Sequence, residues 1–120
     1  MHCPCNSSFN YQDCCEPLHN GVVADSPERL MRSRYSAFAL NLPLYLEQTW
    51  HSSTRQSVEL SDNPEWVQLQ IIKSNQNGNE GMVHFRAFYK HHKELGMMEE
   101  KSDFVREDGQ WFYLQGVVYE

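Results

Sequence analysis

Basic residues are scarce in this chain of 120 residues, which has 10 Lys and Arg against 16 Asp and Glu and a formal net charge of −6. Such a surface as a whole repels phosphate backbones and anionic bilayers, so we expect neither nucleic acid nor a membrane as a partner. No stretch approaches the roughly 18 apolar residues of a spanning helix. The first residues also lack the basic and apolar regions of a signal peptide. We therefore expect a cytoplasmic protein.

Internal repeats and low-complexity tracts are absent as well, and the length suits one compact unit. A two-domain enzyme with a cleft between its domains is therefore not expected. Apolar residues make up 40% of the chain and aromatic residues 12%. This composition is enough to bury roughly two thirds of the surface that the unfolded chain exposes.

No cysteine follows residue 15, and all four lie within the first 15 residues: Cys3, Cys5, Cys14 and Cys15. A disulfide within either close pair would be badly strained, and clustered thiols in a cytosolic chain more often bind metal. Two pairs separated by eight residues can fold back as a hairpin, where four thiolates suit tetrahedral Zn²⁺. We expect one structural Zn²⁺ ion. Four protein ligands leave no position for water, so we assign it no Lewis-acid catalysis.

Two alternatives to the four-cysteine site stay open at this point. The thiols can be free on a frayed terminus. His19 or His2 can also replace Cys15 as the fourth ligand, since adjacent cysteines often have different roles.

The cysteine segment resembles a SEC-C motif, a small zinc hairpin, from CPCNSS at residues 3–8 through Tyr11 to Cys14 and Cys15. The motif usually has Gly where this chain has Asn6, and Asn tolerates the left-handed backbone well enough to make the same turn. The resemblance implies a zinc hairpin over residues 1–19. Basic forms of the motif carry lysines between the cysteine pairs, and this hairpin carries none. The hairpin is a candidate docking site for a protein partner. Because it lacks these lysines, the motif does not indicate which partner that is.

Helices are predicted next along the chain. The sequence DSPE at residues 25–28 combines a capping side chain, a first-turn proline and an acid near the positive end of a helix dipole. An apolar stripe follows at helical spacing. A second short helix is expected from Pro43 to about His51. The residues of the stripe are Met31, Tyr35, Phe38 and Leu42.

From Trp66 onward the period changes to two, which predicts strands. A turn is expected at residues 77–79, a strand over 82–89, a loop over 91–96, and two strands over 97–106 and 110–119 joined at Asp108-Gly109. The order of elements predicts an α+β fold with N-terminal helices packed on a curved antiparallel sheet of about four strands.

Residues 30–38, which read LMRSRYSAF, resemble a signature of the bacterial YchJ family, and shorter matches follow in order to Gly116. The family is similar to the nuclear-transport-factor-2-like (cystatin-like) group, in which helices and a curved sheet form a cone with a pocket. The resemblance implies such a domain over residues 20–120. Longer members carry a second hairpin after the sheet, and this chain has no further cysteine there.

A cone needs polar groups aimed into it before it can bind or react. By the period of two, Glu100 and Ser102 share a strand face with Phe104. We expect an ion pair between Glu100 and Arg32 or Arg34, because a carboxylate among tryptophans is costly unless it is paired. The candidate pocket residues are Arg32, Arg34, Tyr35, Trp50, His51, Trp66, Glu100, Ser102, Trp111 and Tyr113.

Three functions are compatible with the sequence. The first, which we favour, is a non-enzymatic binding or adaptor module that docks through the hairpin and takes a small ligand in the cone. The second is a small cofactor-independent enzyme of the isomerase or dehydratase type, with His51 or His84 as acid or base. The third is a structural domain without a pocket. The chain can be a monomer or a homodimer, since Met82 and Phe88 give the outer sheet face apolar side chains.

Overall fold

The computed structural model describes residues 1–119. One short 3-10 helix, three α-helices and four strands follow one another along the chain. They are η1 (Tyr11–Asp13), α1 (Cys15–His19), α2 (Pro27–Ala39), α3 (Pro43–Gln48), β1 (Glu65–Asn77), β2 (Glu80–His91), β3 (Glu94–Glu107) and β4 (Gln110–Tyr119).

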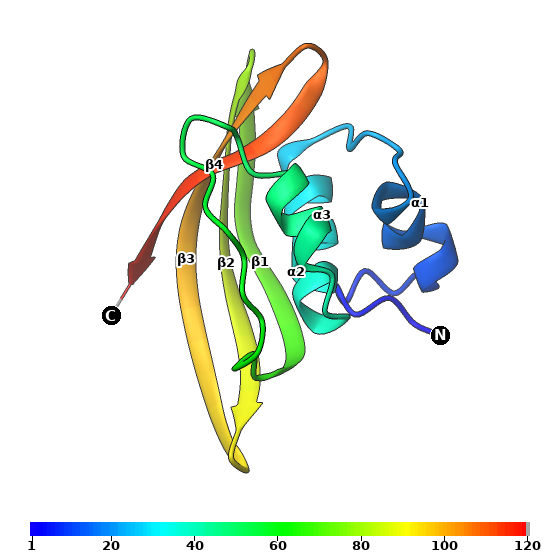
Figure 1. Ribbon diagram of the computed structural model, residues 1–120, viewed down its shortest axis with the longest axis vertical. Helices are drawn as coiled ribbons and strands as arrows, with labels where there is room; N and C mark the ends of the chain where they lie inside the picture. The colour runs from blue at the N-terminus through cyan, green and yellow to red at the C-terminus, as the bar shows by residue number, and fades with distance from the viewer. Residues whose placement is uncertain (120) are drawn as a thin grey trace.

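The strands form one antiparallel sheet in the order β1-β2-β3-β4, so each strand pairs with the next in sequence. Helices α2 and α3 lie on one face of this curved sheet, and α1 with the cysteine segment lies on the far side of α2 (Figure 1). The predicted α+β architecture with about four strands is confirmed. Helix α2 is thus the middle layer of the molecule.

Helix α2 begins where its sequence predicts. The Ser26 hydroxyl accepts a hydrogen bond from the Arg29 backbone N–H at 3.1 Å, and Pro27 occupies the first turn. The helix ends at Ala39, and Leu42 is the N-cap of α3. The apolar stripe on α2 is therefore shorter than expected, because Pro43 starts a separate helix.

The turn between β2 and β3 is tighter than predicted. The two strands continue to His91 and from Glu94, so the expected loop over residues 91–96 is wrong. His92 and Lys93 instead form a two-residue turn with φ of 53° and 70°. This left-handed geometry matches the twist of the strands even without glycine, which is the residue that normally signals it.

Two irregularities in β1 change which residues face the helices. The pairing with β2 shifts register between Trp66 and Gln68, and again between Ile71 and Lys73. A bulge at Val67 lets Trp66 and Leu69, three residues apart, both pack against the core. A strict period of two would have placed these two side chains on opposite faces.

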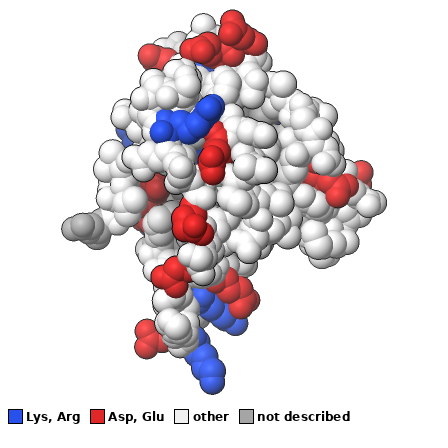
Figure 2. Space-filling view, in the orientation of Figure 1, with Lys and Arg blue, Asp and Glu red and all other residues white. Residues whose placement is uncertain are grey.

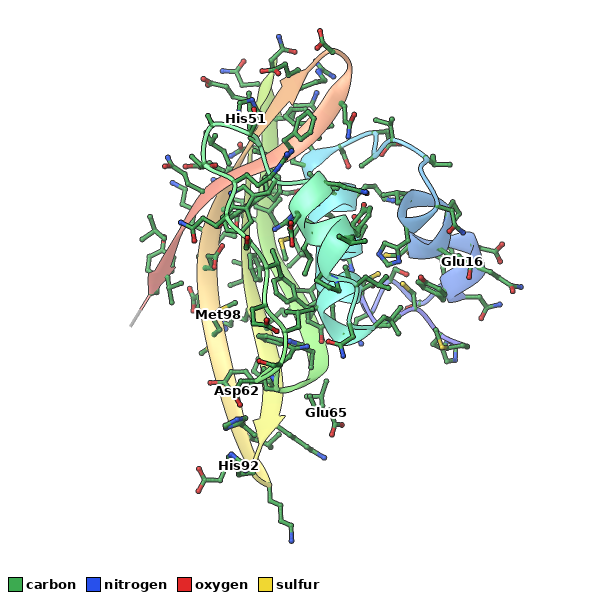
Figure 3. The ribbon with its side chains drawn as sticks, viewed as in Figure 1. Glu16, His51, Asp62, Glu65, His92 and Met98 are labelled. Carbon is green, nitrogen blue, oxygen red and sulfur yellow. The ribbon has the colours of Figure 1, made fainter. Side chains whose placement is uncertain are left out.

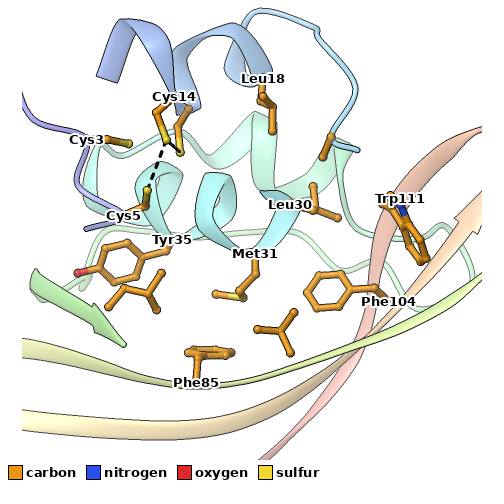
Figure 4. Close-up of a cluster of buried hydrophobic side chains, with 14 of the residues drawn as sticks. Cys3, Cys5, Cys14, Leu18, Leu30, Met31, Tyr35, Phe85, Phe104 and Trp111 are labelled. Carbon is orange, nitrogen blue, oxygen red and sulfur yellow. Dashed lines mark hydrogen bonds between the residues drawn. The ribbon is translucent and has the colours of Figure 1, made fainter. Parts of the chain in front are cut away.

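A continuous cluster of buried side chains joins the cysteine segment to the sheet. Figure 4 shows the cysteines on one side of α2, with Met31 projecting from its other side toward Phe85. The boundary that we expect between residues 1–19 and 20–120 therefore has shared apolar packing across it. Within residues 1–119, no helix has the length and apolar character needed to cross a membrane.

The cap of α2 gives a first test of this fold. Replacing Ser26 by Ala removes the acceptor for the Arg29 N–H, so Ser26→Ala should lower the free energy of unfolding by about 1 kcal/mol. Urea denaturation measures this change. Ser57→Ala is the matched control, because Ser57 is exposed and lies outside the helices and strands. Equal stability of the two variants would show that the cap contributes nothing.

Candidate functional site

The four cysteine sulfurs form a compact buried cluster. All four ligand atoms lie within 4.8 Å of one another, with Cys5 Sγ 3.7 Å from Cys14 Sγ and Cys14 Sγ 3.9 Å from Cys15 Sγ. A regular tetrahedron with metal–sulfur bonds of about 2.3 Å has sulfurs about 3.8 Å apart. The donor set and its spacing therefore fit a tetrahedral metal ion.

Tight turns in the first fifteen residues position these sulfurs. Asn6 has a φ of 62°, the left-handed conformation predicted for it, and its N–H donates to the Cys3 carbonyl at 3.3 Å. The Cys3 N–H donates to the Phe9 carbonyl at 2.9 Å, which closes the loop. The Asn6 side chain also accepts from the Leu69 N–H at 2.6 Å, so the same residue ties the turn to β1.

Helix α2 supports the cluster from behind. The Ser36 hydroxyl lies 3.3 Å from Cys15 Sγ and 3.5 Å from Cys3 Sγ. Arg32 Nη1 donates to the Cys5 carbonyl at 2.7 Å, and Arg29 Nη2 donates to the Cys14 carbonyl at 3.2 Å. Three side chains of one helix therefore hold both halves of the cysteine segment in place.

His19 does not compete for a place among the ligands. Its Nδ1 is 2.6 Å from the Tyr11 hydroxyl, and its Nε2 is 2.8 Å from the Ser33 carbonyl oxygen. Both ring nitrogens are therefore engaged, and burial lowers the pKa of the imidazole. His2 is exposed and forms a β-bridge with Asn10. The geometry favours Cys15 as the fourth ligand.

Contacts among the sulfurs shift the pKa values of Cys3 and Cys15 in opposite directions. Hydrogen bonding with Cys15 and Cys5 lowers the pKa of Cys3 below the ordinary thiol value. The pKa of Cys15 is raised, because its hydrogen bonds to Cys3 and Cys5 and its burial favour the protonated form. A cation that binds thiolates would replace these protons.

A cavity lies on the opposite side of α2, between the helix and the sheet. Its volume is about 260 Å³, slightly below the range of about 300–1,000 Å³ for drug-sized ligands, and leaves room for a small ligand. Apolar and aromatic side chains make most of its wall, and a few polar groups interrupt them. The lining residues are Met31, Arg34, Tyr35, Phe38, Trp50, Trp66, Phe85, Ala87, Met98, Glu100, Ser102 and Tyr113.

Arg34 provides the positive charge of this cavity. The residue is 5% exposed, and its Nη1 donates to the Leu46 carbonyl at 2.8 Å and to the Thr49 hydroxyl at 2.6 Å. Its guanidinium carbon lies 4.7 Å from the centre of the Tyr113 ring. Burial lowers the pKa of Arg34 to about 10, which still leaves the guanidinium charged at neutral pH.

Glu100 lies on the sheet side of the same cavity. Its Oε2 accepts a hydrogen bond from the Ser102 hydroxyl at 2.6 Å. The predicted ion pair between Glu100 and an arginine is wrong: among residues 1–119, the ion pairs of arginine join Arg32 to Glu28 and Arg86 to Glu99. Arg34 Nη1 donates instead to neutral oxygens of Leu46 in α3 and of Thr49, the residue after α3, which the sequence gives no reason to expect.

Most of the predicted pocket residues gather around this cavity. Whether the cavity binds a ligand stays a prediction. The predicted residues that line it are Arg34, Tyr35, Trp50, Trp66, Glu100, Ser102 and Tyr113.

Three predicted residues lie elsewhere. Arg32 points to the cysteine segment, because two positions on a helix are about 200° apart and Arg34 faces the cavity. His51 lies well away from Met98 in Figure 3, with its ring nitrogens near Ser53 and Glu107. Trp111 is buried beside Arg106, whose guanidinium carbon is 5.1 Å from its ring.

Five lining residues were not predicted as part of the pocket. The helical stripe and the period of two contained the signal for most of them, since they place Met31 and Phe38 on the sheet side of α2. The same period places Phe85 and Ala87 on one face of β2. The five are Met31, Phe38, Phe85, Ala87 and Met98.

Comparison with known proteins finds relatives of similar organisation. Residues 26–116 match the family model described as YchJ, middle NTF2-like domain. A UPF0225 protein of Shewanella sp. strain MR-4 is 39% identical over 130 residues, which cover 96% of this chain and 79% of the relative. A UPF0225 protein of Vibrio parahaemolyticus is 37% identical over 126 residues, which cover 98% and 75%.

Two solved structures have the same fold. The solution structure of a SEC-C motif containing protein from Rhodopseudomonas palustris has a TM-score of 0.89 and 31% identity, with 100% of both chains covered. The crystal structure of a SEC-C motif containing protein from Psychrobacter arcticus has a TM-score of 0.81 and 27% identity. It covers 98% of this chain and 82% of that one.

The identity of the fourth ligand can be tested directly. Cys15→Ser should lower the affinity for added Co²⁺ by at least about tenfold and weaken the charge-transfer absorption of thiolate-bound cobalt, because a hydroxyl is a poor replacement for a thiolate. His19→Gln is the matched control and should keep that absorption. Retained absorption in Cys15→Ser together with its loss in His19→Gln would identify histidine as the ligand.

The tyrosines of the cavity should titrate late. Burial raises the pKa of Tyr35 to about 12, and burial together with the Glu100 carboxylate raises the pKa of Tyr113 to about 12. The folded-state pKa of these tyrosines lies above the unfolded value near 10. Burying their neutral hydroxyls therefore costs no ionisation energy below pH 10, and the free energy of unfolding falls as the pH rises from 10 toward 12.

An ultraviolet titration of tyrosinate measures this difference. The chain has six tyrosines. The fraction that ionises only well above pH 10 should shrink in Tyr113→Phe and should be unchanged in Tyr119→Phe, whose ring is exposed. Titration of all tyrosines together near pH 10 in the folded protein would contradict the burial of these two hydroxyls.

Proposed function

Since the chain belongs to the UPF0225 family, with a YchJ-type NTF2-like domain over residues 26–116, we propose that it is a non-enzymatic binding module. One structural Zn²⁺ ion fixes the cysteine segment, and the cavity on the other side of α2 takes a small ligand. The observation that carries this proposal is the aromatic cavity with a charged, buried Arg34 in its wall.

Zinc is the metal that the donor set favours. Four thiolates with tetrahedral spacing suit Zn²⁺, which forms closed structural sites with such ligands. Cys3, Cys5, Cys14 and Cys15 would hold the ion and leave no coordination position for a substrate. Its role is then to stabilise the segment that packs on α2, and the SEC-C neighbours support this reading.

The wall of the cavity favours binding over catalysis. Isomerase or dehydratase chemistry uses a positioned acid or base, commonly a histidine. In the described part of the chain no histidine lines the cavity, and His84 bonds to Glu99 instead. Arg34 is a donor that would orient a ligand, and the aromatic rings provide a surface for an apolar body.

The cysteine segment is the proposed docking site for a protein partner in the cytoplasm. On the face shown in Figure 2, Lys and Arg are few and are separated by Asp and Glu. This distribution, with the net charge of −6, supports the exclusion of nucleic acid and membranes. Either a monomer or a homodimer is compatible with the exposed apolar side chains on β3 and β4.

Elemental analysis tests the zinc proposal. Protein purified without chelator should contain about one zinc per chain, and Cys5→Ser should lose it because Cys5 is fully buried in the cluster. Ser8→Ala is the control in the same segment and should keep the metal. Metal-free wild-type protein with an ordered cysteine segment would contradict the proposal.

Indole as a neutral probe tests the cavity. Of the three tryptophans, Trp50 and Trp66 line it and Trp111 does not. In metal-loaded protein, indole should shift the side-chain N–H signals of Trp50 and Trp66 in nitrogen–proton correlation spectra, with the Trp111 signal as internal control. Unchanged Trp50 and Trp66 signals at millimolar indole and also with charged aromatic probes would mean that the cavity takes no ligand of this kind, and the binding function would fail.

A further inference from the structure

Two opposite charges line the cavity without pairing with each other. Arg34 is only 5% exposed. Its Nη1 donates hydrogen bonds to the neutral oxygens of Leu46 and Thr49. Within residues 1–119, no carboxylate forms an ion pair with it. Glu100 attracts this guanidinium only through space, without a direct ion pair. A buried charge without a bonded counter-charge is costly, so the guanidinium can still bind an anion in the cavity.

The carboxylate of Glu100 is held in an equally specific way. Ser102, which is 1% exposed, donates to its Oε2. Gly116 on the neighbouring strand gives the carboxylate its space, because a Cβ at that position would collide with Oε2. No arginine, lysine or histidine in the described chain forms an ion pair with this carboxylate. The same cavity thus presents a fixed negative group to a cation.

Aromatic rings surround the two charges. Tyr113 and Trp50 lie beside the Arg34 guanidinium, at 4.7 Å and 6.0 Å from its central carbon to their ring centres. Trp66 packs edge to face against Tyr35, with ring centres 6.1 Å apart. The Tyr35 hydroxyl is buried without a hydrogen-bond partner among the described residues. Such a wall fits a flat apolar body and leaves a polar group to satisfy.

We propose, on the basis of the binding function above, that the cavity takes a small zwitterion with a flat apolar body, of the aromatic amino acid kind. The ligand carboxylate faces the free edge of the Arg34 guanidinium, and its ammonium group faces Glu100. The volume of about 260 Å³ suits a ligand of this size.

The two charges together exclude simpler ligands. A plain anion would satisfy Arg34 but would lie near the Glu100 carboxylate, and a plain cation would have the converse problem with Arg34. A neutral apolar molecule would leave both groups unmet. A zwitterion neutralises both groups at once, which is how electrostatic complementarity gives specificity.

Four probes with related apolar bodies separate these cases: L-phenylalanine, phenylpropionate, phenylethylamine and indole. Each is titrated into the metal-loaded full chain, and the side-chain N–H signals of Trp50 and Trp66 are followed with Trp111 as internal control. L-Phenylalanine should bind at least about tenfold more tightly than either singly charged analogue, because each analogue leaves one buried charge unmet.

Glu100→Gln tests the negative end without removing side-chain volume. The variant should reduce the affinity for L-phenylalanine to about that for phenylpropionate, and its affinity for phenylpropionate should be unchanged or higher. Glu94→Gln is the matched control, since Glu94 is exposed at the start of the same strand. Both variants keep Arg34, so the fold is not put at risk at the buried guanidinium.

The outcomes distinguish this proposal from the binding function on which it rests. Tightest binding of L-phenylalanine, lost in Glu100→Gln and kept in Glu94→Gln, supports it. If phenylpropionate, phenylethylamine or indole binds as tightly as L-phenylalanine, the zwitterion proposal is wrong while the binding function stands. If none of the four probes shifts Trp50 or Trp66, both are wrong.

Discussion

Helix α2 is buried on both sides, and the positions of the sulfur cluster and the cavity both depend on it. On one side Ser36 contacts the sulfurs of Cys3 and Cys15, and on the other side Met31 and Tyr35 face the sheet. A chain of this length can sustain such a middle layer only if something covers the helix opposite the sheet. The cysteine segment does so, and a metal ion would keep that cover in place.

The buried guanidinium of Arg34 lowers the stability of the fold, a cost that a purely structural domain would avoid. A leucine or methionine in place of Arg34 would fill the cone without desolvating a guanidinium. Instead, α3 and Thr49 provide oxygens for one of its nitrogens, and the aromatic rings of Trp50 and Tyr113 flank its face. The arrangement immobilises the arginine in a defined orientation. Such preorganised polar groups in an apolar wall are typical of specific ligand sites.

Local rules predicted much of this molecule. The cap at Ser26, the left-handed turn at Asn6 and the shared face of Glu100, Ser102 and Phe104 follow from short-range geometry, and the structure has them. The period of two also gave the inner face of β2. The α+β order of helices and strands follows from the same signals.

Contacts between distant residues were beyond such rules. The bulge that turns Trp66 inward depends on pairing with β2, and the tight turn at His92 has no glycine to mark it. Which of two arginines enters the cavity depends on the rotation of α2 against both of its neighbours. The oxygens that receive Arg34 belong to α3 and to the residue after it, a contact that no local pattern encodes.

Hydrogen exchange of the α2 backbone amides, compared between metal-loaded and chelator-stripped protein, tests most directly whether the cysteine segment supports the helix that forms the cavity. If it does, the central amides of α2 lose protection by at least about tenfold on metal removal, while those in the middle of β2 and β3 keep most of theirs. Protection of α2 that is unchanged after complete removal of the metal would show that the helix, and the cavity with it, stand without the sulfur cluster.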